Sequence, residues 1–555
     1  MKLLKRSRNF ASKALLLWAI AFLAGCSDPD ATTSADATTS AAVEATTAAD
    51  SAAADPAITT LSAEALAAAL SSGELSARAV TQAFLERIAA LNEQGPQLRA
   101  VLELNPSALE DADALDRQFS RSGVIGPLHG VPVLIKGNIE IAGLLASAGS
   151  LALADGVGPV EKDAFLVSSL RQAGAVILGT ANLSEWANFR DQKSSSGWSS
   201  QGGQTRNPHV LDRNTCGSSS GSAVAVAARM APLAVGTETN GSIVCPAAAS
   251  GVVGIKPTLG LVSRRGIIPI SSTQDTAGPM GRSVTDAALL LEALTQFDAA
   301  DPAAIRASSP VYRPDPGSTR LDGKRIGVLR TYSGVGERPR LDEIYQRTIE
   351  QVADLGATLV DPIEYQSSPE SRSAAYRILL REFKATLNDY LAGRKLPADR
   401  DSLADLITYN RSHANRVMPI FEQSIFLEAE AMTGLDDPGY AEDIANVQNR
   451  LRADLSALFD THQLDALLLP GNAPAWKTDW VNGDHFTYGG TAYLAAISGY
   501  PSIVLPAGAV ARLPVAVGLM GRPQSEAALI QMAYALEQAL PPALEPGFLP
   551  SIEFP

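Results

Sequence analysis

The sequence predicts an α/β protein with a largely buried sheet, organised as one large domain over residues 57–545. Short β-branched, apolar runs alternate with stretches of helical periodicity, which is the pattern of an α/β layer. Hydrophobic residues make up 46% of the chain and charged residues 19%, so the chain can bury a large core. The predicted strands lie at residues 131–135, 175–178, 326–329, 466–469 and 502–505.

Helices are predicted at both ends of this domain. Residues 60–89 carry apolar side chains at helical spacing, interrupted at Ser72-Gly73, which indicates two helices in succession. Residues 527–540 form an amphipathic pattern that ends before two prolines, and residues 546–555 are expected to be a tail. The more polar stretch 310–460 is expected to supply helices and insertions around a site.

The charge balance excludes a nucleic-acid-binding function. The chain has 59 acidic and 45 basic residues, a net charge of −14, and only 6% aromatic residues. A phosphate-binding surface needs clustered lysine and arginine, and single-strand binders need aromatic platforms. We therefore expect no nucleic acid among the partners.

Residues 1–25 have the form of a secretory signal peptide. A basic start is followed by the apolar run 14–23, which is too short to span a bilayer comfortably. The segment ends in Leu-Ala-Gly-Cys at 23–26, which resembles the lipobox of bacterial lipoproteins and makes Cys26 the expected lipid acceptor. The alternative is an ordinary signal peptide with a chance cysteine. Ser27, by its resemblance to enterobacterial lipoproteins, favours an outer-membrane anchor facing the periplasm.

Residues 26–56 are expected to be the lipidated cysteine followed by a disordered tether. Alanine, serine, threonine and aspartate dominate this stretch, and such a composition cannot bury enough apolar surface to fold. Beyond the tether only Cys216 and Cys245 remain. Two cysteines cannot form a disulfide framework for so large a domain, and two buried free thiols are favoured over a single bridge.

The run Gly-Ser-Ser-Ser-Gly at 217–221 leaves three hypotheses open. It matches the nucleophile elbow of α/β-hydrolases, which would make Ser219 the nucleophile of an esterase, but residues 213–216 are a poor strand. The later histidines 413, 462 and 485 also lack the context of a triad. A Ser-x-x-Lys arrangement fails because no lysine beyond the signal peptide has a serine three residues before it. The third hypothesis combines two serines with a distant lysine.

Lys136 is the candidate for that lysine. It ends the apolar run 131–135, where burial would favour the neutral amine and make it a base. The alternative is a lysine that extends from a strand end into water. A second polar turn, Gly-Thr-Glu-Thr-Asn-Gly-Ser at 236–242, offers successive backbone amides that suit an oxyanion hole.

These motifs together resemble the amidase signature family. The resemblance rests on the blocks 203–208, 217–222, 236–242 and 246–258, on Lys136 within 130–137, on Asn182 and Glu185 within 179–185, and on Asp275 before Gly278-Pro279. It implies a mixed β-sheet flanked by helices and a Ser-Ser-Lys triad. Carried over by position, Ser242 is the nucleophile, Ser218 the bridging serine on a cis peptide after Gly217, and Lys136 the base.

The resemblance also implies the rest of the site. The amides of Thr239, Asn240, Gly241 and Ser242 would form the oxyanion hole, and Ser219 joins the substrate-binding set. The sequence departs from the family pattern at residues 216, 220 and 240, which are usually glycines, and at 238 and 244. These departures concern the shape of the pocket, since the triad is intact.

The expected function is hydrolysis of carboxylic amides or peptide C-terminal amides through a serine acyl-enzyme. Residues 236–246 and 260–269 are most similar to bacterial peptide amidases. No metal, cofactor or obligate partner subunit is implied; the expected partners are the amide substrate and, through the lipid, a membrane. The remaining alternative is a lipid-anchored binding protein of the same fold without activity.

Overall fold

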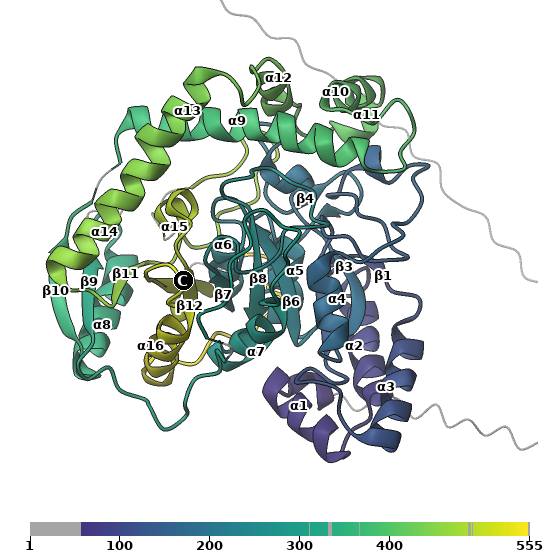
Figure 1. Ribbon diagram of the computed structural model, residues 1–555. Coiled ribbons are helices and arrows are strands. Elements are labelled where there is room, and N and C mark those ends of the chain that lie inside the picture. Colours follow the sequence, from purple (N-terminus) through teal and green to yellow (C-terminus); the bar gives the residue numbers. More distant parts are fainter. Residues whose placement is uncertain are drawn as a thin grey trace, which may run out of the picture. The chain divides into compact units, whose positions relative to one another are not determined.

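The computed structural model describes residues 57–309, 311–330, 336–365, 367–486, 490 and 492–552 (Figure 1). The predicted signal peptide, the lipidation of Cys26 and the tether fall outside the described residues and stay predictions. Residues 546–552, predicted as a tail, lie against residues 208–211, where Leu549 pairs with Val210.

The described residues contain one large mixed sheet of eleven strands. Its order is β1-β3-β2-β6-β8-β7-β12-β13-β11-β9-β10, with parallel pairs around β2 and β9 and antiparallel pairs between them. A two-stranded ladder, β4 with β5, stands apart. The predicted strands correspond to β2, β3, β9, β11 and β12, which confirms the α/β class. The strands are β1 (Val101–Leu104), β2 (Pro132–Lys136), β3 (Val176–Ala181), β4 (Trp198–Ser199), β5 (Gly203–Gln204), β6 (Leu233–Glu238), β7 (Val253–Lys256), β8 (Thr276–Gly281), β9 (Arg325–Leu329), β10 (Thr358–Ile363), β11 (Ala466–Pro470), β12 (Ser502–Val510) and β13 (Leu513–Met520).

Helices flank this sheet (Figure 1). The two predicted opening helices are α1 and α2, separated where Gly73 takes φ +78° and ends α1. The predicted closing helix is α16. The helices are α1 (Ala63–Ser72), α2 (Ala77–Leu91), α3 (Ala108–Ser122), α4 (Phe165–Gln172), α5 (Ser220–Ala227), α6 (Val244–Ser250), α7 (Val284–Leu294), α8 (Pro339–Asp354), α9 (Pro369–Ala392), α10 (Leu403–Ser412), α11 (Ala414–Val417), α12 (Ser424–Glu430), α13 (Pro438–Ile444), α14 (Arg450–His462), α15 (Ala492–Ser498) and α16 (Glu526–Ala539).

The centre of the sheet brings the ends of two parallel strands together. β2 and β6 are neighbours, with residues 133–135 paired to residues 233–235, and every residue of both strands is buried. Lys136 is the last residue of β2, and β6 ends at Glu238, from which the chain turns into α6. Because parallel strands end at the same edge, this topology places the lysine beside the 239–243 turn.

The stretch 310–460 supplies the helical layer that the sequence predicted around the site. α9 runs along one side of the molecule with α10, α12 and α13 packed against it (Figure 1). A separate apolar cluster joins α9, α10 and α12 to residues 146–189 and 268–270, which border the site. No helix among the described residues is both long enough and apolar enough to cross a bilayer.

Candidate active site

Lys136 and Ser218 meet in the interior of the protein. The Lys136 Nζ and Ser218 Oγ atoms are 2.7 Å apart, although the residues are 82 positions apart in the sequence. Both side chains are fully buried. The structure therefore rejects the alternative in which Lys136 extends into solvent.

Thr237 completes the surroundings of the amine. Lys136 Nζ lies 2.8 Å from Thr237 Oγ1 and 3.2 Å from its carbonyl oxygen, and Asn138 Nδ2 donates to Thr237 Oγ1 at 3.0 Å. No carboxylate is within ion-pair distance of Lys136 among the described residues. Burial lowers the pKa of Lys136 to about 7, against the attraction of Asp275 and Glu238. A large fraction of the amine is therefore neutral near neutral pH.

Ser218 is held by the backbone of the segment before α5. The Gly217–Ser218 peptide is cis, as the family resemblance implied, and the Ser184 amide donates to the Ser218 carbonyl at 3.0 Å. No polar group other than Lys136 Nζ contacts Ser218 Oγ within the described structure. The Ser218 hydroxyl therefore has room for a further hydrogen bond, through which it can link the Lys136 amine to a third group.

Ser242 stands in a turn whose amides point to no protein acceptor. In the part of the chain that the structure describes, no hydrogen bond uses the N–H groups of residues 239–242. The next two amides, of Ile243 and Val244, donate to Glu238 Oε2 at 2.8 and 3.1 Å. Gly241 takes φ +89°, a conformation that favours glycine and bends the turn. The turn therefore has the form of an anion-binding nest beside the Ser242 hydroxyl.

Ser219 does not share this position. Its Oγ donates to the Thr237 carbonyl at 3.0 Å and accepts from the Thr237 amide at 3.2 Å, so the hydroxyl joins α5 to β6. The histidines of the esterase hypothesis are engaged elsewhere: His485 lies 3.2 Å from Asp479, and His413 stacks on Tyr409. The geometry speaks against Ser219 as a nucleophile and against its direct contact with substrate.

Asp275, which the sequence singled out without a role, supports the turn. It accepts hydrogen bonds from Thr239 Oγ1 at 2.5 Å and from the amides of Ile270 and Ser271 at 2.7 and 2.8 Å. Burial raises the pKa of Asp275 to about 6. Asp275 thus ties the oxyanion turn to the wall formed by residues 268–271. The sequence does not show the bond between Asp275 and Thr239 or the contact of Thr237 with Lys136. Both depend on which loops meet in the fold.

A cavity of about 310 Å³ opens at Ser242. Its wall includes residues 187–189 and 239–242, and a smaller hollow behind it reaches Ser218 and Thr237. Among the described residues that line the larger cavity, no side chain is charged, and two of them, Ala187 and Asn188, have left-handed φ values of 53° and 68°. An uncharged acyl group fits this environment.

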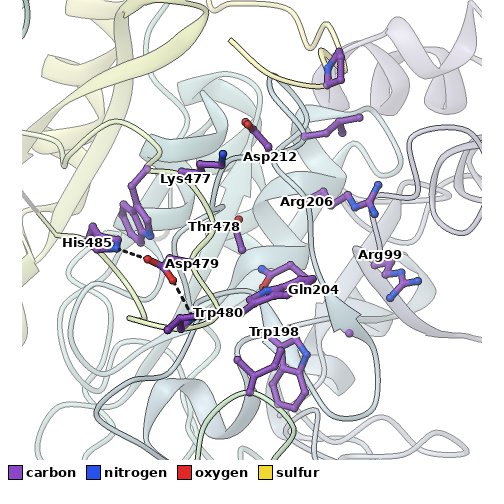
Figure 2. A pocket seen from close by; sticks show the side chains of 16 residues that line it. Arg99, Trp198, Gln204, Arg206, Asp212, Lys477, Thr478, Asp479, Trp480 and His485 are labelled. Carbon is purple, nitrogen blue, oxygen red and sulfur yellow. Dashed lines mark hydrogen bonds and ion pairs between the residues drawn. The ribbon is translucent and has the colours of Figure 1, made fainter. Parts of the chain in front are cut away.

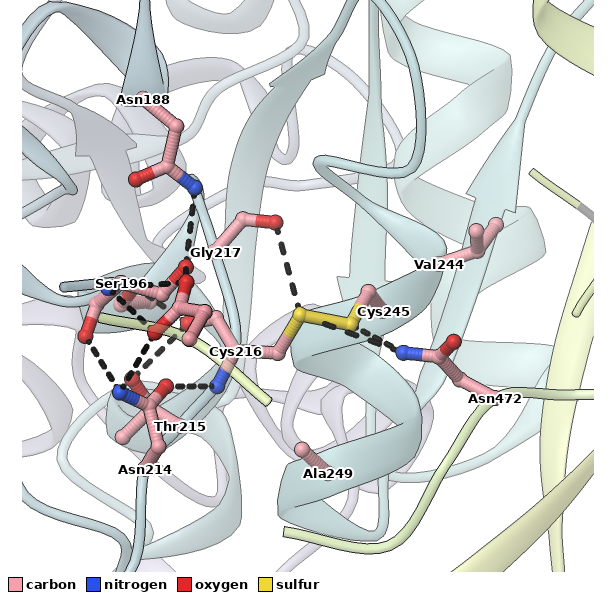
Figure 3. The surroundings of a disulfide bond; sticks show 12 residues. Asn188, Ser196, Asn214, Thr215, Cys216, Gly217, Val244, Cys245, Ala249 and Asn472 are labelled. Atoms are coloured by element: carbon pink, nitrogen blue, oxygen red, sulfur yellow. Dashed lines mark hydrogen bonds between the residues drawn. A yellow bond between two sulfur atoms is a disulfide. The ribbon is translucent and has the colours of Figure 1, made fainter. Parts of the chain in front are cut away.

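The structure corrects the expectation that Cys216 and Cys245 are free thiols. The two form a disulfide, with Cα atoms 5.8 Å apart across a sequence separation of 29 residues (Figure 3). Cys216 takes φ +53°, which favours glycine, the residue that the family usually has there. The loop-closure account gives such a bridge about 3 to 4 kcal/mol of stabilisation.

The disulfide joins the two serine segments of the site. Cys216 stands two residues before Ser218, and Cys245 three residues after Ser242, at the start of α6. Both cysteines line the cavity, and the Asn472 amide contacts the Cys245 sulfur (Figure 3). A second tie runs from the Ser219 amide to the Ser242 carbonyl at 3.1 Å.

We expect loss of this bridge to lower the rate of catalysis as well as the free energy of unfolding. In the variant Cys216→Gly/Cys245→Ala the glycine relieves the left-handed backbone, but Ser218 and Ser242 lose their covalent tie. Displacements of about 1 Å at reacting groups change rates by up to about 100-fold, and we expect roughly tenfold here. Kinetics of amide hydrolysis with and without a phosphine reductant measure the effect. A double variant with the wild-type rate, or one that a reductant still inhibits, would contradict it.

The described residues contain no group of three or more His, Cys, Asp or Glu side chains placed to hold a metal ion. Lys136 and Ser218, with Ser242 in the turn of free amides, instead place a buried amine, two hydroxyls and an anion-binding nest in one region. These are the parts of an acyl-transfer centre.

Comparisons with known proteins agree with this chemistry. Residues 79–530 match the family described as Amidase. A probable amidase from Arabidopsis thaliana is 37% identical over 471 residues, covering 83% of this chain and 86% of its own length. The native peptide amidase of Stenotrophomonas maltophilia is 46% identical with a TM-score of 0.83, covering 88% of this chain and 98% of its own. A complex of the peptide amidase PAM with the competitive inhibitor chymostatin is 47% identical with a TM-score of 0.82, covering 87% and 98%.

The family match spans most of the chain, and the likeness extends to the mixed sheet and its flanking helices. The chain therefore belongs to the amidase signature family and is a hydrolase of carbon–nitrogen bonds.

Proposed function

We propose that this chain hydrolyses the C-terminal amides of peptides and related carboxylic amides, with Ser242, Ser218 and Lys136 as its triad. The observation that carries the proposal is the 2.7 Å contact between Lys136 Nζ and Ser218 Oγ, buried beside the free amides of the 239–242 turn. The intact triad speaks against a binding protein without activity.

The three contacts of the amine suit its neutral form. A neutral amine has two N–H donors and one lone pair. Thr237 offers two acceptors, its carbonyl oxygen and Oγ1, at 3.2 and 2.8 Å. The lone pair is then directed to Ser218, whose O–H donates to Nζ across the 2.7 Å contact. Neutral Lys136 is therefore arranged to receive a proton from Ser218.

Acyl transfer follows from this relay. Ser218 passes its proton to Lys136 as it takes the proton of Ser242, whose oxygen attacks the amide carbon. The negative charge on the carbonyl oxygen is held by the N–H groups of residues 239–242, each such donor being worth about 3 kcal/mol in other enzymes. Lys136 returns the proton through Ser218 to the departing nitrogen, which leaves as ammonia. Water, deprotonated by the same relay, then attacks the ester and releases the carboxylic acid and Ser242.

The cavity and the relatives support this substrate class. The cavity beside Ser242 has an uncharged lining, so it suits the acyl residue of a neutral C-terminal amide. The neighbours that share the fold at 46–47% identity are peptide amidases. A free C-terminal carboxylate would bring a charge into this uncharged lining without a cation to meet it.

A panel of substrates tests this function. We expect ammonia release from N-acylated dipeptide amides with apolar or neutral C-terminal residues. At least about tenfold slower turnover is expected for amides with charged C-terminal residues, because a charge in the uncharged cavity is desolvated without a partner. Ammonia assays and mass spectrometry of the acid product provide the measurement. Turnover of esters alone, with no amide cleaved, would overturn the proposal.

A further inference from the structure

A second and larger cavity lies beside the catalytic one. It has a volume of about 1080 Å³, and we call it the tryptophan pocket because Trp198, Trp476 and Trp480 line it (Figure 2). Trp476 makes an edge contact with Phe486, with ring centroids 4.8 Å apart, and Phe486 lines the catalytic cavity. The Trp476–Phe486 pair therefore borders both cavities.

The tryptophans are held in place before any ligand binds. Trp480 is 56% exposed, yet its Nε1 donates to Gln204 Oε1 at 3.1 Å. Gln204 is itself fixed by a bond to the Ser196 carbonyl at 2.8 Å. Trp198 is buried against Phe421, with ring centroids 5.1 Å apart. Exposed aromatic rings that are already ordered bind ligands with little loss of conformational entropy.

The pocket lining also holds more cations than carboxylates: three, Arg99, Arg206 and Lys477, against two, Asp212 and Asp479. Within the described residues, no carboxylate lies within ion-pair distance of Arg99, Arg206 or Lys477 (Figure 2). The lining carboxylates are already engaged. Asp212 lies 3.2 Å from Arg213, and the Asp479 carboxylate accepts from the Asn482 side chain and from the amides of residues 481 and 482. Those hydrogen bonds hold the pKa of Asp479 well below its usual range.

This charge is unusual in a chain whose net charge is −14. It also contrasts with the catalytic cavity, whose lining is uncharged. A substrate that carries acidic and aromatic side chains could not place them beside Ser242 without desolvating a charge. The tryptophan pocket offers what such side chains need: cations for carboxylates and the exposed ring of Trp480 for aromatic rings.

We infer that the tryptophan pocket is a second substrate site, which binds an acidic, aromatic-containing segment of an amidated peptide upstream of the scissile amide. The inference rests on the proposed function. The peptide would extend from Ser242 past the exposed ring of Phe486 into the pocket. Binding there lowers KM for such peptides and leaves short amides unaffected, since a dipeptide amide fills only the catalytic cavity.

Matched peptides test the inference in the full enzyme. Two hexapeptide amides share their C-terminal dipeptide, and one carries Glu-Trp-Glu upstream where the other carries Gln-Ser-Gln; the dipeptide amide alone is the third substrate. We expect KM for the acidic peptide to be about tenfold lower than KM for the neutral one. This difference in KM should shrink as the salt concentration rises. The variant Arg206→Gln/Lys477→Gln should remove this advantage and leave the dipeptide amide unchanged. Arg121→Gln/Lys162→Gln removes two exposed cations outside the pocket and should change nothing.

A binding measurement separates this inference from the proposed function. The acidic peptide with a free carboxyl terminus should quench tryptophan fluorescence in the wild type and not in Trp480→Ala. Binding without hydrolysis of any amide would support the pocket and overturn the proposed function. Hydrolysis with equal KM for both hexapeptides in every variant would overturn the inference that the tryptophan pocket binds substrate, and it would leave the proposed function standing. Binding of anionic phospholipid vesicles in place of the peptide would also overturn it.

Discussion

Replacing Ser242 by alanine is expected to abolish amide hydrolysis and leave the fold intact. The hydroxyl makes no hydrogen bond to the protein among the described residues, and its side chain faces a cavity, so its removal costs little stability. Loss of a triad nucleophile costs about 10⁴-fold or more in related acyl-transfer enzymes. Steady-state kinetics, together with labelling by a fluorophosphonate probe, measure the loss. Circular dichroism checks the fold.

Ser219→Ala is the matched control for this variant. It removes a neighbouring hydroxyl that bonds to the Thr237 backbone, so we expect lower thermal stability with probe labelling retained. If Ser219→Ala instead abolishes labelling while Ser242→Ala keeps it, the esterase hypothesis is right and the triad is wrong.

Replacing Lys136 by alanine should remove the acidic limb of the pH–rate profile. In the wild type, the active form has neutral Lys136, whose pKa burial lowers to about 7. The acylation rate should therefore fall about tenfold per pH unit below this value and level off above it. Without the amine, we expect a rate about 10² to 10⁴-fold lower with no limb near pH 7. Stopped-flow acylation across pH 5–9 measures both effects, and added methylamine should restore part of the rate.

Lys256 offers a matched control for the lysine. It is equally buried and has a pKa lowered to about 8, but within the described structure its Nζ donates only to the carbonyls of Pro257 and Tyr500. Lys256→Met should change stability and leave the limb near pH 7 in place. If Lys136→Ala keeps both the rate and the limb, Lys136 is not the base.

Much of the fold was open to prediction because its signals are local. The apolar runs at β2, β3, β9, β11 and β12 stand out in the sequence, as do α1, α2 and α16. The strand order was not predictable, since β6 pairs with β8 and β7 with β12 through contacts far apart in the chain. β10 escaped prediction because its residues are largely exposed and lack an apolar run.

The features of the site likewise divide into those that the sequence could predict and those that it could not. Lys136, Ser218 and Ser242 stand in motifs, so a resemblance could identify them. The disulfide was wrongly expected to be two thiols because 29 residues of sequence do not show that two segments run side by side. The bonds of Thr237 and Asp275 depend on side-chain placement at the edge of the sheet, which no local pattern encodes.

The complete burial of β2 and β6 gives Lys136 a role besides proton transfer. Strands that are apolar on both faces carry no alternation, so hydrophobic burial alone hardly distinguishes the native register from one shifted by a single residue. A shift would turn Lys136 to the opposite face and leave its buried amine without Thr237 and Ser218. An unsatisfied buried amine costs several kcal/mol. The lysine that we propose as the base thus also favours one alignment of the strands around it.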